Sequence, residues 1–276
     1  MYDLEIALSG DIDDGREDLE RCLRPLAEML TTLDIPMTIP VVAEALQQHP
    51  RKIERLRDAG IEIAGHGDIH QPFVGPVGVQ VKRLQAMNRV FKEILGDPPI
   101  GFRAPFLAHD ENLYPALAKV GLEYDSSRVA RDIVLRLRYL FSRRPLAFSD
   151  PTWRLPSMMI QHLSGEAVPR PHTVAPGVLE LPVFELDDWF FIESHRGPRL
   201  RPEEGAMLAE TWLRAVRHFR RKGYVLVLQA HPMRISPSHL GTLEYFIDAA
   251  RNLRSGFFTL SQLSERCSSR SAGGLA

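Results

Sequence analysis

Two histidines follow an apolar stretch at a spacing that could bind a metal ion. Residues 61–65 have the sequence IEIAG, and His66 and His70 come directly after them. Imidazoles four positions apart lie on one face of a helix and can reach the same ion. Gly67 argues against a helix here and favours a tight turn. This motif by itself is therefore weak evidence, and two surface histidines in a turn are its better interpretation.

Three aspartates cluster after the first apolar stretch. Asp11, Asp13 and Asp14 follow residues 4–9, which have the pattern of a strand. A carboxylate at this place can cap the next helix, bind a metal ion or act as a general base. Helix capping accounts for one aspartate but not for three, so the cluster indicates chemistry as well as capping.

Five more side chains lie at the ends of strand-like stretches: Arg103, Asp187, Asp188, Trp189 and His231. Each has an ordinary structural explanation. The arginine could be solvated, the tryptophan could belong to the core, and the histidine could be a satisfied core residue. Two acids beside a tryptophan favour a site, however, and a histidine after a buried strand could be a general acid.

Strand-like and helix-like patterns alternate along the chain. This order predicts an α/β fold with a parallel sheet, and about seven units favour a distorted (β/α)7-type barrel. In such barrels the chemistry lies at the carboxyl ends of the strands, so the polar residues above should form one site. The expected strands are 4–9, 37–41, 61–64, 100–104, 179–184, 224–230 and 257–260, and the expected helices are 16–33, 51–60, 79–96, 111–121, 203–223 and 239–252.

Length and composition favour one globular domain. The chain has 276 residues, of which 44% are hydrophobic, and 34 basic against 35 acidic residues give a net charge of −1. This charge does not favour nucleic acid or membrane binding. Cys22 and Cys267 form neither a disulfide framework nor a metal-binding pair. Since no leader or membrane-spanning pattern is visible, we expect a cytoplasmic protein.

Two segments depart from the alternating pattern. Residues 126–178 are long and irregular, and we expect an insertion or lid over the strand ends. Residues 266–276 are rich in serine and glycine, and we expect a disordered tail after a single domain of residues 1–265. The oligomeric state stays open.

The motifs, in their order, resemble those of the polysaccharide deacetylase family, with its nodulation-type chitooligosaccharide deacetylase homology domain. They are GDIDDG, HGDIH, FRAPF, LDDW and LQAHP. The resemblance covers residues 4–260 with a gap at the insertion, and it is closest to the peptidoglycan deacetylase and allantoinase-like branch. The ordered set is fairly specific, whereas no single motif is.

The resemblance implies roles for individual residues. His66 and His70 would complete an Asp-His-His metal site, and Arg103 would orient and charge-balance the base. The backbone N–H near Phe106 would help to form an oxyanion hole. His231 would protonate the leaving amine. Asp188 would orient His231, and Trp189 would line the substrate pocket.

The assignment within GDIDDG has two registers. The commonest family form, Thr-Phe-Asp-Asp-Gly, would make Asp13 the base and Asp14 the ligand. The Asp-x-Asp form makes Asp11 the base and Asp13 the ligand, and Asp14 then caps the next helix. We prefer the second register because GDID matches that branch better and because residues i and i+2 of a strand point to the same face.

The resemblance implies a metal-dependent hydrolase that removes N-acetyl groups from a substrate containing an amino sugar. Two histidines and one aspartate suit zinc, but also cobalt, manganese or iron. A cyclic-amide hydrolase of the allantoinase-like kind and a catalytically silent carbohydrate-binding relative are the alternatives.

A basic stretch within the expected insertion could influence the choice of substrate. Residues 128–144 contain six arginines interspersed with apolar side chains. Such a stretch can contact anionic lipid or a phosphate group. A lid helix with a solvated basic face is the interpretation that we favour.

Overall fold

The structure is a computed structural model that describes residues 2–13, 19–130, 170–188, 202–220 and 224–273. Eleven strands in these ranges form one sheet in the order β6-β9-β10-β1-β2-β3-β4-β5-β8-β7, and β11 also pairs with β1. The strands are β1 (Leu4–Ser9), β2 (Met37–Val41), β3 (Glu62–Gly65), β4 (Gly101–Phe102), β5 (Tyr124–Asp125), β6 (Val129–Ala130), β7 (His172–Ala175), β8 (Val178–Glu180), β9 (Val183–Phe184), β10 (Val225–Gln229) and β11 (Ser255–Phe257). The β7–β8 pair is antiparallel and the other pairs are parallel.

The chain itself joins the two ends of this strand order. β8 lies beside β5 at one end and β9 lies beside β10 at the other, yet only two residues, Leu181 and Pro182, separate them. The segment of β5 and β6 runs parallel to β8 and β9 across this seam, where backbone N–H groups of Leu181 and Val183 donate to the carbonyls of Asp125 and Arg128 (both 2.8 Å). The segment of β5 and β6 counts as one bent strand, and the segment of β8 and β9 counts as another. Together with β1, β2, β3, β4 and β10 they give the seven parallel strands of the expected distorted barrel.

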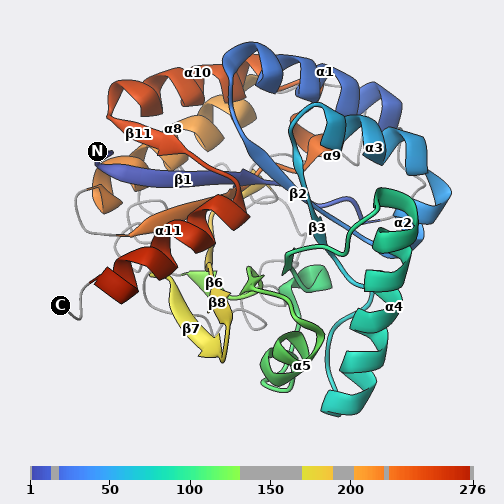
Figure 1. Ribbon diagram of the computed structural model, residues 1–276. Coiled ribbons are helices and arrows are strands. Elements are labelled where there is room, and N and C mark those ends of the chain that lie inside the picture. Colours follow the sequence, from blue (N-terminus) through green and yellow to red (C-terminus); the bar gives the residue numbers. More distant parts are fainter. Residues whose placement is uncertain (1, 14–18, 131–169, 189–201, 221–223, 274–276) are drawn as a thin grey trace, which may run out of the picture.

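Most helices pack around the outside of the curled sheet (Figure 1). Leu23, Leu26 and Leu30 recur at helical spacing in α1 and are buried in the same core as the strand residues Ile6 and Leu8. No helix in the described ranges is long and apolar enough to span a membrane. The helices are α1 (Leu19–Leu33), α2 (Ala43–Gln48), α3 (Pro50–Asp58), α4 (Val77–Leu95), the 3-10 turn η1 (Pro105–Leu107), α5 (Leu113–Val120), α8 (Pro202–Phe219), α9 (Pro232–Ile235), α10 (Leu240–Asn252) and α11 (Leu260–Gly273).

Strand alternation separates an outer core from an inner one. In β1, Leu4, Ile6 and Leu8 belong to the large outer core, whereas Ala7 belongs to a second, smaller core. The smaller core also contains Val225 and Val227 of β10, so residues that alternate along a strand point to opposite faces of the sheet. A side chain two residues after one that points inward, such as that of Ala7, therefore also points to the inside of the barrel, nearer to the end of the strand.

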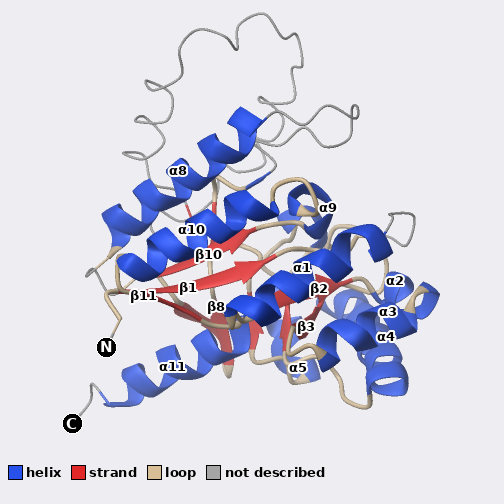
Figure 2. Ribbon diagram, turned by 90° about the horizontal axis from the view of Figure 1, so that it is seen from above, coloured by secondary structure: helices blue, strands red, loops and turns tan. Residues whose placement is uncertain are grey.

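The expectation of a disordered tail from residue 266 is wrong as far as Gly273, where α11 ends. Arg266 and Arg270 both pair with the buried Glu5 of β1, with N···O distances of 2.6 and 2.7 Å. Leu263 of the same helix is fully buried in the inner core. The serine-rich composition suggested a loose tail, but these contacts hold the helix against β1, on the other side of that strand from α8 and α10 (Figures 1 and 2).

The expected bounds of the insertion, 126–178, are too wide at both ends, because residues at each end belong to the sheet. Residues 126–130 continue from β5 into β6, and His172–Ala175 form β7 beside β8. These short strands have too few residues to show a periodicity in sequence. Residues 131–169, with the expected lid, lie outside the described ranges.

Candidate active site

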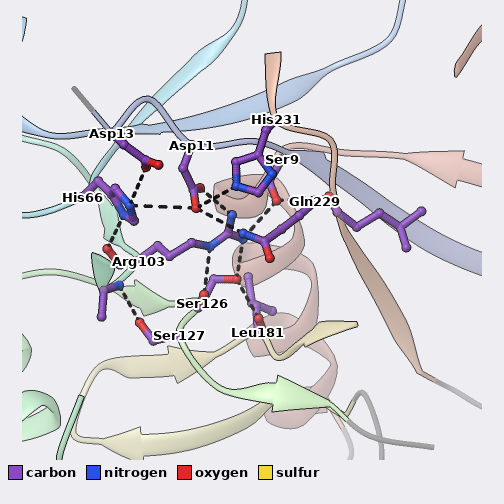
Figure 3. Close-up of polar contacts among 12 residues, drawn as sticks. Ser9, Asp11, Asp13, His66, Arg103, Ser126, Ser127, Leu181, Gln229 and His231 are labelled. Carbon is purple, nitrogen blue, oxygen red and sulfur yellow. Dashed lines mark hydrogen bonds and ion pairs between the residues drawn. The ribbon is translucent and has the colours of Figure 1, made fainter. Parts of the chain in front are cut away.

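Polar side chains from five different strands gather at the carboxyl end of the barrel. Asp11 follows β1, His66 follows β3, Arg103 follows β4, Ser126 follows β5 and His231 follows β10 (Figure 3). All five residues are buried. Because parallel strands end at one edge of the sheet, residues far apart in sequence lie together here.

Asp13, His66 and His70 form a compact set of ligand atoms. The Nε2 atoms of His66 and His70 lie 3.4 and 3.3 Å from Oδ1 of Asp13, and all three ligand atoms are within 4.8 Å of one another. His66 is buried, whereas Asp13 and His70 are half-buried. The turn of Gly67, which has φ +94°, brings the second histidine back toward the first.

This set fits a divalent metal ion. In tetrahedral zinc sites the nitrogen and oxygen ligands lie about 2.1 Å from the ion, which places the ligand atoms about 3.4 Å from one another. Nδ1 of His66 is 2.8 Å from the backbone carbonyl of Arg103 and must carry the proton to donate to it. Nε2 then carries no proton, and its lone pair faces Asp13. In metal-bound histidines, a hydrogen bond from the other ring nitrogen orients the ring in the same way.

Asp11 lies beside this cluster and is held by two donors. Arg103 donates from NH1 to Oδ1 at 2.8 Å, and Gln229 donates from Nε2 to Oδ2 at 3.1 Å. Burial by itself would raise the pKa of Asp11, but the positive charges of Arg103 and His231 hold it well below its ordinary value. Asp11 is therefore an ionised carboxylate.

Arg103 is fully buried and all three of its guanidinium nitrogens are bonded. Besides Asp11, it donates to the carbonyl and the hydroxyl of Ser126 (2.9 and 3.0 Å) and to the hydroxyl of Ser9 (2.9 Å). These bonds fix the plane of the guanidinium group between Asp11 and Ser126 (Figure 3). The expected contact between Arg103 and an aspartate of GDIDDG is thus present, and the aspartate is Asp11.

His231 lies on the other side of Asp11 and is bonded to Asp188. Its Nδ1 is 2.7 Å from Oδ1 of Asp188, and its backbone N–H donates to Oδ2 at 2.6 Å. Its Nε2 points toward Oδ2 of Asp11 at 3.7 Å. Burial would lower the pKa of His231, but Asp188 and Asp11 outweigh it and raise the pKa well above the ordinary value, so the side chain is an imidazolium near neutral pH.

A turn with unusual backbone geometry borders the metal-binding set. Phe106 and Leu107 both have positive φ (59° and 55°), which L-residues rarely adopt and which costs on the order of 1–3 kcal/mol each. The exposed ring of Phe106 lies against His70, with 4.2 Å between the ring centroids. The backbone of Phe106 is therefore at the rim of the site, where the sequence expectation put an oxyanion donor.

Residues 8–124 match the model of the polysaccharide deacetylase family. These residues, which are less than half of the chain, are similar to a polysaccharide deacetylase domain. Of the residues described above, Asp11, Asp13, His66, His70 and Arg103 fall inside the matched region. His231 and Asp188 lie beyond it and reach the same site through the barrel fold.

One curated protein is similar to this chain over part of its length. The peptidoglycan deacetylase-like protein FGM2 of Gibberella zeae is 29% identical over 167 residues, which are 58% of this chain and 48% of that protein. The chain thus matches about half the length of this curated relative.

Two solved structures share the fold. A protein of Mycobacterium smegmatis assigned to the polysaccharide deacetylases has a TM-score of 0.73 and 22% identity, covering 98% of this chain and 92% of that one. PuuE allantoinase has a TM-score of 0.69 and 16% identity, covering 96% and 90%. At these identities the likeness shows the fold alone.

Several residues that the sequence analysis expected in the site lie outside the described ranges or away from the cluster. Asp14, Trp189 and residues 131–144 of the basic stretch are outside the described ranges. Arg128, the first arginine of that stretch, pairs with Glu111 (3.1 Å) and donates to the hydroxyl of Tyr114 (2.5 Å). This arginine is thus engaged within the fold.

The sequence analysis missed three polar residues that complete the site: Ser9, Ser126 and Gln229. Ser9 and Gln229 each stand two positions before a predicted site residue, Asp11 and His231. Extending the strand alternation backward from those residues would have found both. Ser126 follows the two-residue strand β5, which is too short to recognise by its pattern.

Proposed function

We propose that this protein is a metal-dependent hydrolase of amide bonds that removes N-acetyl groups from a substrate containing an amino sugar. One observation supports the proposal above others. The set of Asp13, His66 and His70 lies beside the carboxylate of Asp11, which has the imidazole ring of His231 on its other side. A three-ligand site with an acid and a base nearby is the arrangement that hydrolysis of an unactivated amide needs.

In this proposal Asp13, His66 and His70 hold the ion, and Asp11 is the general base. A divalent ion there would supply Lewis acidity, which makes a nearby water more acidic and a carbonyl carbon more electrophilic. Asp11 has a low pKa and is by itself a weak base. In this role Asp11 takes the proton of the attacking water, and a bound divalent ion would compensate for its weakness as a base.

The remaining residues handle the leaving group and the charge on oxygen. His231, kept protonated by Asp188, gives its proton to the departing amine as the C–N bond breaks. Arg103 keeps Asp11 ionised and in place through the bond to Oδ1. The backbone N–H of Phe106 is in the turn beside His70 and donates to the oxyanion of the tetrahedral intermediate.

The same groups could also open a cyclic amide, so the proposed substrate class rests on the similarity of residues 8–124 to the polysaccharide deacetylase family. The test therefore uses purified protein loaded with zinc, cobalt, manganese or iron in separate samples. Release of acetate is measured with N-acetylated amino-sugar oligomers, and ring opening is measured with cyclic amides. We expect metal-dependent release of acetate that a chelator abolishes and added metal restores. Ring opening without release of acetate would favour the allantoinase-like alternative.

Two variants separate the ligand from the base. Asp13→Ala should lose both metal and activity. Asp11→Asn should keep its metal content and lose about 100- to 10,000-fold in kcat, the range measured for general bases. Metal content and kcat are measured on the same samples, with Asp58→Asn on exposed α3 as the matched control. Undiminished activity in Asp11→Asn, or lost metal in that variant, would contradict this assignment of the two aspartates.

A further inference from the structure

Two carboxyl groups are buried together at the barrel seam, directly below the site. Asp125 of β5 and Glu180 of β8 are partners in a parallel strand pair, and both are fully buried. Neither was singled out by the sequence motifs, and neither contacts the metal-binding set. A pair of buried acids is unfavourable if both are ionised, because burial and mutual repulsion both act against the charges.

The hydrogen bonds of the pair account for one oxygen of each group. The hydroxyl of Ser127 donates to Oδ1 of Asp125 at 2.7 Å, and the backbone N–H of Arg128 donates to Oε1 of Glu180 at 3.0 Å. Oδ2 of Asp125 and Oε2 of Glu180 have no donor among the described residues. Asp125 and Glu180 are opposite each other in the β5–β8 register, so their side chains lie next to each other on one face of the sheet. One added proton would turn one of these oxygens into a donor and satisfy both.

The electrostatic setting agrees with a retained proton. Burial first, and then the negative charge of Asp125, raise the pKa of Glu180 well above its ordinary value. The ionisable neighbours from the packed elements are Arg128, Tyr114 of α5, Tyr124 of β5 and His172, which lies opposite Glu180 in the β7–β8 pair.

The pair is linked to the active site through Ser127. While the Ser127 hydroxyl donates to Asp125, its oxygen accepts the backbone N–H of Ala104 at 2.8 Å. Ala104 lies between Arg103 and the strained turn with Phe106 and Leu107. The adjacent Ser126 holds the guanidinium of Arg103 (Figure 3). The strand end at residues 125–127 therefore fixes the backbone between the two functional groups.

We propose that Asp125 and Glu180 share one proton and, through Ser127, position the turn that presents the Phe106 N–H and the side chain of Arg103. They are positioning residues, because neither contacts the reacting atoms. The catalytic half of this inference rests on the proposed deacetylase function, whereas the shared proton does not.

The shared proton is tested by the pH dependence of folding of the metal-loaded protein. Between the ordinary pKa of a glutamic acid and the raised pKa of Glu180, the folded state keeps a proton that the unfolded state has lost. The unfolding equilibrium constant then rises by about tenfold per pH unit from this proton alone, so stability falls as pH rises. Glu180→Gln keeps a donor toward Asp125 and an acceptor toward Arg128, and it should lack this tenfold dependence.

A second substitution tests whether the neighbouring His172 causes the pH dependence. The difference between the wild type and Glu180→Gln should persist when both contain His172→Asn. Equal pH dependence with and without Glu180→Gln would overturn the shared proton. This measurement needs no enzyme assay, so it gives a result even if the protein releases no acetate and the proposed function fails.

The positioning role is tested with Ser127→Ala, which removes one oxygen atom. We expect kcat to fall about ten- to a hundred-fold, since small misplacements of catalytic groups have effects of this size, with KM and metal content unchanged. Ser255→Ala, which removes a buried hydroxyl from β11, is the matched control and should keep the wild-type kcat. A purely structural role would lower the folded fraction without changing kcat per metal-loaded molecule, so an unchanged kcat in Ser127→Ala would overturn the positioning role.

Discussion

His66 and His231 show how hydrogen-bond partners give one side chain two different electrostatic states. Nδ1 of His66 donates to a neutral carbonyl, which leaves Nε2 as a lone pair beside Asp13. Nδ1 of His231 instead meets the carboxylate of Asp188, and a second carboxylate, Asp11, lies near its other nitrogen. The carboxylate at Nδ1 favours the protonated ring of His231, which suits a proton donor, whereas the carbonyl at Nδ1 of His66 leaves Nε2 available as a ligand.

The pH profile of the proposed reaction should report the state of His231. As the general acid, His231 must be protonated, and activity should fall as pH rises through its raised pKa. Asp188→Asn removes one of the charges that raise this pKa, so the alkaline limb of kcat/KM should move to lower pH. Steady-state rates measured across pH test this, with Asp248→Asn, at an exposed position of α10, as control. An alkaline limb that does not move would exclude His231 as the titrating acid.

At the scale of elements, the loops after β3 and β4 need backbone shapes that few residues allow. Gly67 has φ +94°, and a Cβ added there would meet the Phe73 ring at 2.9 Å and the carbonyl of Ile69 at 3.2 Å. The turn is further fixed by Arg83, which pairs with Asp68 at 2.8 Å and donates to the carbonyl of Pro72 at 2.7 Å. The spacing of the two metal-binding histidines therefore depends on a turn and not on a helix.

Gly67→Ala should damage both stability and metal binding. Forcing an L-residue into this conformation, with a contact below 3 Å, should lower the unfolding free energy by about 1–3 kcal/mol. Metal affinity should fall as well, because His66 and His70 flank the turn. Gly78→Ala is the control, since Gly78 lies in α4 with an ordinary φ and open space around it. Denaturant unfolding and metal titration measure the two effects, and a Gly67→Ala protein as stable as Gly78→Ala would contradict the role of this turn.

At the scale of the whole molecule, one end of the barrel holds the candidate active site, and the other end is closed by packing against α11. The carboxyl ends of the strands hold the residues of the candidate active site. At the other end, the N–H groups of Leu260 and Ser261 at the start of α11 donate to Thr38 and Glu62 (2.8 and 3.1 Å). Leu263 of this helix fills the inner core beside Ala7 and Tyr124.

Truncating the helix side chain in the inner core should therefore affect stability without affecting chemistry. Leu263→Ala should lower the unfolding free energy by about 2–5 kcal/mol, as removal of a fully buried leucine does. The kcat of the folded protein should stay at the wild-type value. Exposed Glu265→Ala in the same helix is the control, and unfolding curves are compared with rates per metal-loaded molecule. A Leu263→Ala variant that unfolds like the control would contradict this packing.

Much of the barrel and of its site follows from local properties of the sequence. Strand alternation and helical spacing are short-range patterns, and they predicted the parallel order of elements and the strand ends at which Asp11, His66, Arg103 and His231 lie. The register within GDIDDG also had a local argument, because positions i and i+2 share a face. In the structure Asp11 contacts Arg103, and Asp13 lies with the histidines.

Other features depended on contacts between residues distant in sequence, which no local pattern encodes. The two-residue strands β5 and β6 exist because they pair with β8 and β9 across the seam. The serine-rich tail is helical because its arginines reach Glu5, some 260 positions earlier. The charge state of His231 and the pairing of Asp125 with Glu180 likewise depend on burial and on neighbours that only the folded chain brings together.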